Sequence, residues 1–275
     1  MEKIPKVIHY CWFGKQPLPE SVRKCIDSWR KHLPDYQIKE WNESNYDIEG
    51  CEYVKEAYAH KKWAFVTDYA RLDVVYQFGG IYLDTDVEVI KPFDGLLAND
   101  AFAGFDDDDQ INTGVGFGAR AHNPVIRENR DAYNHLSFYN TDGSLNLITC
   151  PRITSDILKR HGAKMNNTYQ RLENITLYPR EYFCPLNYYT GVLQKTDNTL
   201  SIHHFSMSWM NKKDVRWHNI HSKVSRIFGR KLSFILVYGI KFGLFVLSDT
   251  FLHGPRHALT ETRKKWRKNN VERVD

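Results

Sequence analysis

Three carboxylates alternate with apolar residues in "FGGIYLDTDVEVI", residues 78–90, which otherwise has the pattern of a buried strand. Because successive side chains of a strand point to opposite faces, we expect Asp84, Asp86 and Glu88 to share one face. Unpaired buried carboxylates are costly, so that face requires solvent, a cationic partner or a metal ion. The Asp-x-Asp pair offers hard oxygen ligands suited to Mg²⁺ or Mn²⁺. Taken alone, the pair is better explained by two solvent-facing residues of an edge strand.

A second charged pair lies on the segment before this strand. The stretch "HKKWAFVTDYARLDVVYQFGG" predicts a helix that ends at Gly79-Gly80, because its apolar residues recur at helical spacing. The residues expected to face the core are Trp63, Val66, Ala70, Val74 and Phe78. Asp68 and Arg71 are three residues apart, so they share one side of this helix. They form either a local salt bridge or a ligand site, in which Asp68 accepts from sugar hydroxyls and Arg71 contacts a charged or hydroxylated group.

The elements around these residues predict an α/β fold with a nucleotide-binding type of sheet. Residues 4–13 predict a first strand, residues 17–34 a helix and residues 36–42 a second strand. The helix has Val22, Cys25, Ile26 and Trp29 at core-facing positions. Residues 100–119 predict a short strand, a charged loop and another strand. We interpret "FDDDDQ", within that loop, as solvated rather than as a metal or acceptor site.

Composition places the chain among ordinary folded proteins and separates its two ends by charge. The 275 residues are 42% hydrophobic and 26% charged. Residues 212–275 hold 15 Lys and Arg against 5 Asp and Glu, so their formal charge is +10 and that of residues 1–211 is −5. Five scattered cysteines without a CxxC pair argue against a disulfide framework or a cysteine zinc site. With an N-terminus that lacks the pattern of a signal peptide, we expect a cytoplasmic location.

The C-terminal segment combines an apolar stretch with basic flanks. Residues 232–247 are at the short end for a helix that spans a membrane. They predict either a buried helix or an element bound to an anionic membrane surface, and we favour the second because basic residues lie on both sides. We therefore divide the chain into a catalytic domain, residues 1–215, and a helical membrane-associating segment, residues 216–275. A nucleic-acid partner is not expected, because the basic tail lacks interleaved aromatic residues.

Three motifs in order resemble the glycosyltransferases of family 32, which include initiating mannosyltransferases and capsule transferases, with the clostridial glucosylating toxins as more distant relatives. "FVTDYARLDVVYQFGGIYLDTDVEVIKP" resembles their DXD-containing sugar-binding region. "IPKVIHYCWFG" resembles their opening strand, and "IHHFSMSW" resembles their closing element. The resemblance covers roughly residues 4–210. It implies a GT-A fold, a nucleotide-sugar donor, a divalent metal (Mn²⁺ or Mg²⁺) and retention of anomeric configuration.

The resemblance also implies roles for individual residues. Asp84 and Asp86 match the DXD carboxylates, with Asp86 favoured as the direct metal ligand and Asp84 expected near the ribose, the sugar or the metal. Asp68 and Arg71 match contacts to the donor sugar. His204 resembles the late contact to metal or diphosphate, and the neighbouring His203 competes for that role. The residues implied in donor binding are Trp12, which would stack on the nucleobase, Tyr82, Asn112, Ser208 and Trp209. A core tryptophan is an equally good interpretation of Trp12.

The expected activity is transfer of a hexose or N-acetylhexosamine from a nucleotide-sugar to a hydroxyl of a lipid-linked surface glycan. UDP-sugars are favoured over GDP-mannose as donors. We expect same-face attack by the acceptor hydroxyl, because no residue of the motifs is placed as a covalent nucleophile. A toxin-like protein glycosyltransferase and a non-catalytic nucleotide-sugar-binding protein are the alternatives. The non-catalytic alternative is disfavoured, because binding without turnover does not require all of Asp68, Arg71, Asp84 and Asp86.

Overall fold

The computed structural model describes residues 3–207 and 212–253, and the chain forms two compact units. The first unit comprises Met1–Asn187 and Leu193–Met210, and the second comprises Tyr188–Val192 and Asn211–Asp275. The boundary that we place between residues 215 and 216 stays a prediction.

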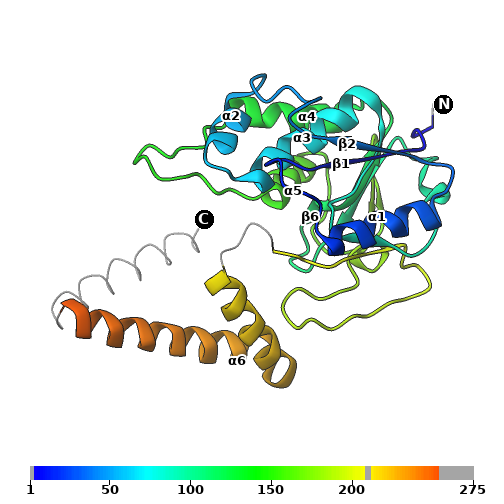
Figure 1. The fold of residues 1–275 in the computed structure, drawn as a ribbon. Helices are drawn as coiled ribbons and strands as arrows, with labels where there is room; N and C mark the ends of the chain where they lie inside the picture. Colours follow the sequence, from blue (N-terminus) through cyan, green and yellow to red (C-terminus); the bar gives the residue numbers. More distant parts are fainter. Residues whose placement is uncertain (1–2, 208–211, 254–275) are drawn as a thin grey trace. The chain divides into compact units, whose positions relative to one another are not determined.

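A mixed seven-stranded sheet forms the centre of the first unit (Figure 1). Its strand order is β2-β1-β3-β6-β5-β8-β7. The strands are β1 (Val7–Cys11), β2 (Gln37–Trp41), β3 (Gly80–Tyr82), β5 (Ala101–Phe105), β6 (Ile111–Ala119), β7 (Gln170–Arg171) and β8 (Thr176–Tyr178). The first three run parallel, and β6 pairs antiparallel with both β3 and β5. This confirms the predicted α/β class and the GT-A expectation of a mixed sheet flanked by helices.

Helices cover both faces of this sheet, and the alternation along β1 shows which residues meet them. Ile8 and Tyr10 join an apolar cluster with α1 (Glu20–His32), whereas Cys11 joins a second cluster on the opposite face. That second face is covered by α2 (Glu52–Ala59), α3 (Trp63–Phe78), α4 (Pro124–Asp131) and α5 (Cys150–Arg160). Short 3-10 turns occur at Asp94–Leu96, Ala132–His135 and Arg180–Tyr182.

The two helices that frame the acidic stretch form largely as their periodicity predicts. In α1 the buried residues are the four expected ones, Val22, Cys25, Ile26 and Trp29. The helix α3 ends where Gly79 adopts a φ of 64°, a conformation that glycine reaches without a steric penalty. The prediction for Phe78 was wrong, because its side chain is 48% exposed. It stacks instead on Trp41 at the edge of the sheet, with ring centroids 5.3 Å apart.

The prediction of one continuous acidic strand was also wrong. The strand β3 ends at Tyr82, and β4 (Val87–Val89) belongs to a separate two-stranded sheet with β9 (Ser201–His203). Between them the amide of Val87 donates to the carbonyl of Asp84 at 3.0 Å, which closes a turn. The turn interrupts the strand alternation from which a shared face for the three carboxylates was predicted. Alternation alone could not reveal that the chain changes sheets here.

The second unit contains α6 (Lys212–His253), which is broken at Gly229 with φ 76° and ψ 161°. The predicted apolar stretch at residues 232–247 lies within its second half. Across the break, the buried hydroxyls of Ser225 and Ser233 are hydrogen-bonded, and Ser233 also contacts His221. Over residues 3–207 and 212–253, no helix combines the length and apolar character needed to cross a bilayer.

Candidate active site

The turn that joins β3 to β4 carries the Asp-x-Asp pair. Just before it, the amide of Leu83 donates to the carbonyl of His9 on β1 at 3.1 Å, which fixes the start of the turn against the parallel part of the sheet. At its far end, β4 is held in register by β9, where Val87 lies opposite His203. The pair is therefore anchored to a different sheet on each side.

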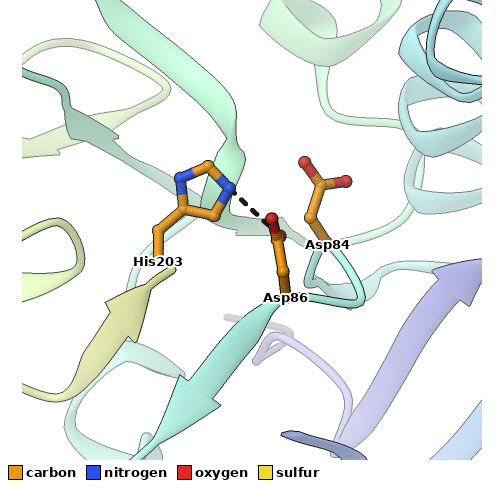
Figure 2. Close-up of side chains that lie close together, drawn as sticks. All are labelled: Asp84, Asp86 and His203. Carbon is orange, nitrogen blue, oxygen red and sulfur yellow. Dashed lines mark ion pairs between the residues drawn. The ribbon is translucent and has the colours of Figure 1, made fainter. Parts of the chain in front are cut away.

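Asp84, Asp86 and His203 form a cluster that can hold a metal ion (Figure 2). One ligand atom from each lies within 4.8 Å of the others. The Nε2 atom of His203 is 3.1 Å from Asp86 Oδ1, and its Nδ1 atom is buried without a hydrogen-bond partner. Two carboxylates and an imidazole whose Nε2 atom faces Asp86 are a fitting donor set for a divalent cation, and the nitrogen favours Mn²⁺ over Mg²⁺.

Asp86 is held in its charged form. Its Oδ2 accepts from the amide of Ser206 at 2.7 Å, and its carbonyl accepts from the amide of His204 at 3.0 Å. Burial disfavours the charge, but the imidazole of His203 and the bonds from Ser206 outweigh it, so the pKa of Asp86 lies below its usual value. Burial likewise opposes the charged form of His203, but Asp86 raises the pKa of His203 overall. The two residues stabilise each other's charge.

Arg71 connects Asp84 to the helix before it. Its Nη2 atom is 3.0 Å from Asp68 and 3.2 Å from Asp84, and the Arg71 side chain is only 5% exposed. Tyr82 adds a hydrogen bond from its hydroxyl to Asp84 at 3.1 Å. Burial, partly offset by Arg71, raises the pKa of Asp84 to about 6 and also raises the pKa of Asp68. The sequence suggested a local salt bridge between Asp68 and Arg71, and in the structure Arg71 also pairs with Asp84 in the Asp-x-Asp turn.

The strand β6 closes one side of this cluster. A Cβ atom on Gly114 would lie 2.4 Å from Asp84 Oδ2, so only glycine allows the carboxylate to approach this strand. The amide of Gly114 donates to Asn112 Oδ1 at 2.8 Å, and Asn112 in turn donates to Asp106 at 3.3 Å. Asn112 thus lies beside the cluster, where the resemblance suggests a donor-sugar contact.

The two histidines of the repeat face different partners. His203 joins the aspartates, whereas His204 Nε2 lies 2.9 Å from Glu88 Oε2. The structure therefore brings the competitor, His203, into the cluster rather than His204. Because neighbouring residues at a strand end point in opposite directions, the pairing of β9 with β4 decides which histidine faces Asp86. Without this strand pairing, the sequence alone predicts only that one of the two histidines faces Asp86.

Of the three remaining predicted donor-binding residues, the structure describes one, Trp12. Trp12 follows β1, is half-buried against the α1-side cluster, and donates from Nε1 to the carbonyl of Gln16 at 2.5 Å. Both of its interpretations, nucleobase stacking and core packing, stay open. Ser208 and Trp209 lie outside the described residues.

Two features were missed by the sequence analysis. In the acidic loop, the Asp107 side chain is 4% exposed and is bound by Arg180 and Asn187, so this carboxylate is not a solvated one as expected. Cys150, the first residue of α5, contacts Arg71 and Thr113 beneath the cluster. The cysteine was considered only as a possible disulfide or zinc ligand, and no sequence signal assigned it to the site.

A family of known proteins matches the part of the chain that contains the Asp-x-Asp turn. Residues 19–103 match the family described as "Glycosyltransferase sugar-binding region containing DXD motif". The chain carries this glycosyltransferase region. The matched segment includes α1, α3 and the turn with Asp84 and Asp86, and the predicted resemblance to DXD glycosyltransferases is confirmed.

A curated relative and two solved structures are also similar. Inositol phosphoceramide mannosyltransferase 1 of Schizosaccharomyces pombe is 32% identical over 111 residues, which are 37% of this chain and 34% of that protein. The structure of "PaToxG Glycosyltransferase" has a TM-score of 0.45 at 20% identity, covering 58% of this chain and 69% of its own. A glycosyltransferase involved in glycosylation of the major capsid of PBCV-1 has a TM-score of 0.42 at 13% identity, covering 74% and 95%. The fold described above rests on the chain's own strands and helices rather than on these two likenesses.

Proposed function

We propose that the chain is a metal-dependent glycosyltransferase that moves a hexose or N-acetylhexosamine from a nucleotide-sugar to an acceptor hydroxyl. The observation that carries this proposal is the cluster that His203 forms with Asp84 and Asp86, the two carboxylates of the DXD sugar-binding region. Asp84 is paired with Arg71 and Asp86 with His203, but Arg71 is shared with Asp68, so a divalent cation would offset the negative charge that is left.

The chain's own residues supply binding and orientation in this scheme. Asp84, Asp86 and His203 would hold the cation, which when bound stabilises the negative charge that develops on the departing nucleoside diphosphate. Arg71 keeps Asp84 in place, and the amide of Ser206 keeps Asp86 in place. Asp68 and Asn112 lie on the side of the cluster toward α3 and β6, where they can hydrogen-bond to hydroxyls of the donor sugar. This arrangement orients the anomeric carbon before reaction.

We infer that anomeric configuration is retained by same-face attack of the acceptor hydroxyl. The carboxylate of Asp68 is buried and lies 3.0 Å from the guanidinium of Arg71. A carboxylate that is engaged in this way is a poor covalent nucleophile, because it would have to leave its cationic partner. The departing phosphate then serves as the base for the acceptor hydroxyl. A glycosyl adduct trapped on Asp68 would overturn this part of the proposal.

The donor and acceptor are narrower proposals. UDP-sugars are favoured, with GDP-mannose as the competing donor, and Trp12 is the residue proposed to stack on the nucleobase. The acceptor would be a lipid-linked glycan of a surface polysaccharide such as capsule or O-antigen. A toxin-like transfer to protein is the second candidate. A non-catalytic nucleotide-sugar-binding role is less favoured, since binding alone does not require all of Asp68, Arg71, Asp84 and Asp86.

The second unit supports an acceptor at an anionic membrane surface. Around the break in α6, large apolar side chains are exposed, namely those of Ile227, Phe228, Leu232, Ile235 and Ile240. Residues 212–253 contain eight Lys and Arg against two Asp. Apolar side chains together with basic ones are typical of helices that lie in the interface of anionic membranes. We propose peripheral binding at the inner face of the cell membrane.

Donor hydrolysis tests the proposed activity. Purified protein is incubated with UDP- and GDP-sugars and Mn²⁺, and nucleoside diphosphate release is followed with and without EDTA. Release from one donor that is lost with EDTA and in Asp86→Asn supports the metal-dependent transferase. No release together with no metal-dependent nucleotide binding would contradict the metal-dependent transferase, whereas binding without release would mean that the acceptor is the missing component.

Sedimentation with liposomes tests the membrane part separately. Binding to vesicles that contain phosphatidylglycerol, but not to neutral vesicles, is expected, and it should weaken in a Phe228→Ser, Ile235→Ser double variant. Equal sedimentation with both vesicle types, or with neither, would contradict an anionic membrane partner.

A further inference from the structure

A cysteine lies at the centre of the buried contacts that hold Arg71. Cys150 begins α5 and is 6% exposed. Its Sγ atom is 3.9 Å from Nη1 of Arg71 and 3.7 Å from Oγ1 of Thr113, both of which donate to the sulfur. Thiol sulfur is a weak acceptor that also carries a weak donor, so it can join groups of both kinds.

The surroundings of Cys150 keep its proton on the sulfur. Burial and the nearby charge of Asp68 raise the pKa of Cys150 well above its ordinary value. The S–H group is therefore available as a donor, and the Asp68 carboxylate lies near enough to act on it electrostatically. Cys150 thus receives hydrogen bonds from Arg71 and Thr113, and Asp68 is a nearby charged acceptor for its S–H group.

These contacts join three elements that the chain brings together from distant positions. Asp68 and Arg71 come from α3, Thr113 from β6, and Cys150 from the first turn of α5. Within this group Arg71 also reaches Asp84 at 3.2 Å. A change in the thiol would therefore act on the Asp-x-Asp turn through Arg71, without Cys150 touching a donor.

We propose that Cys150 is a positioning residue that fixes the Asp68 carboxylate and the Arg71 guanidinium in the orientation needed for the donor sugar. This inference rests on the proposed function for its kinetic consequences, but its hydrogen bonds are open to measurement without turnover. The competing explanation is that Cys150 only fills space in the core. The two explanations predict different effects of substitution. If Cys150 acts through hydrogen bonds, serine should replace it, because serine retains a donor and an acceptor whereas alanine and valine retain neither.

Infrared spectroscopy tests the hydrogen bond directly. The S–H stretching band of Cys150 is obtained as the difference between wild type and Cys150→Ala. An S–H that donates to a carboxylate absorbs at lower wavenumber than a free thiol. We expect this lowered band, and we expect it to move upward in Asp68→Asn, where the acceptor is neutral. A band at the free-thiol position that Asp68→Asn leaves unmoved would overturn the proposal.

Kinetics of donor hydrolysis provide the second readout. We expect kcat/KM to fall about tenfold in Cys150→Ala and Cys150→Val, and to stay within about threefold of wild type in Cys150→Ser. Thr113→Val should fall in the same direction by less. Cys184→Ala is the matched control, because Cys184 is likewise a buried cysteine but is hydrogen-bonded to the carbonyl of Leu186 rather than to any of these residues. Its melting temperature should fall while kcat/KM stays unchanged.

The outcomes separate this proposal from the proposed function. If wild type neither releases nucleoside diphosphate from any donor nor binds nucleotide in a metal-dependent way, the proposed function fails and the infrared result alone decides the role of Cys150. If wild type is active and serine restores no more activity than alanine, Cys150 only fills space, and the transferase assignment stands.

Discussion

The guanidinium of Arg71 lies 3.2 Å from the carboxylate of Asp84, so the first acid of the Asp-x-Asp pair is held by a cation on the preceding helix. The same guanidinium lies 3.0 Å from Asp68. One buried cation therefore connects the helix, the Asp-x-Asp turn and the cluster of Asp84, Asp86 and His203.

Removal of this cation should affect both stability and activity. In Arg71→Met a buried guanidinium is lost, and the buried Asp68 and the partly buried Asp84 lose their partner, so we expect the free energy of unfolding to fall by about 3 kcal/mol and donor hydrolysis to be lost. Chemical denaturation and nucleoside diphosphate release measure the two effects. The matched control is Arg120→Met, since Arg120 pairs with Asp100 at 2.9 Å but is 34% exposed. That change should cost less than about 1 kcal/mol and leave hydrolysis intact. Equal losses in the two variants would contradict the role of Arg71.

A methyl group at Gly114 should displace Asp84. The Cβ atom of Gly114→Ala would lie 2.4 Å from Asp84 Oδ2, too close for the carboxylate to keep its place. We expect Mn²⁺ affinity to fall about tenfold, measured by the electron paramagnetic resonance signal of free Mn²⁺. Gly95→Ala is the control, because nothing lies within 4 Å of its added Cβ. Unchanged affinity in Gly114→Ala would mean that Asp84 is not needed where the structure places it.

The two histidines of the repeat should differ in their effect on metal binding. His203 lies 3.1 Å from Asp86, whereas His204 pairs with Glu88. His203→Ala should weaken Mn²⁺ binding by at least about tenfold, and His204→Ala should leave it nearly unchanged. Calorimetric titration of both variants measures this difference. The reverse order would return the metal contact to His204.

His9 should make the fold sensitive to acid. It is 1% exposed, its Nδ1 accepts from Trp41 Nε1 at 3.0 Å, and its Nε2 donates to the carbonyl of Gly79 at 2.8 Å, so it is neutral. Burial lowers the pKa of His9 to about 4, so between pH 6.5 and 4 the unfolded chain binds more protons than the folded one. Its stabilisation is thus complete above pH 6.5 and is lost as the pH falls toward 4, by about 3 kcal/mol in total.

The comparison of wild type with His9→Gln isolates this effect. Glutamine can donate to Gly79 and accept from Trp41 but does not titrate in this range. The difference in unfolding free energy between the two proteins should therefore change across pH 4–6.5 and be constant above it. A constant difference over the whole range would show that His9 does not titrate as described.

The fold was largely predictable because its helices and strands are marked by local patterns. The four buried residues of α1 follow from helical spacing, and Gly79 marks the end of α3. The break between β3 and β4 was not predictable, because it depends on the pairing of β4 with β9, more than a hundred residues later in the chain. The choice of His203 over His204 depends on the same long-range pairing.

The site was predictable where a motif covers it and not elsewhere. Asp68, Arg71 and Asp84 were chosen from the motif, and the structure brings them into contact. Cys150 and Gly114 complete the surroundings through contacts between α5, β6 and α3 that no local spacing encodes. Phe78 followed the helical pattern yet lies at the surface, because the neighbouring Trp41 at the sheet edge provides its partner.

The central claim is that Asp84, Asp86 and His203 hold the metal on which donor cleavage depends. The most direct measurement is the anomalous difference map of crystals soaked with Mn²⁺ and UDP or GDP. A peak at about 2 Å from the carboxylate of Asp86 and a ring nitrogen of His203 is the result that the account predicts. A peak bound by Glu88 and His204 instead, or no peak at the Asp-x-Asp turn in the presence of bound nucleotide, would contradict it.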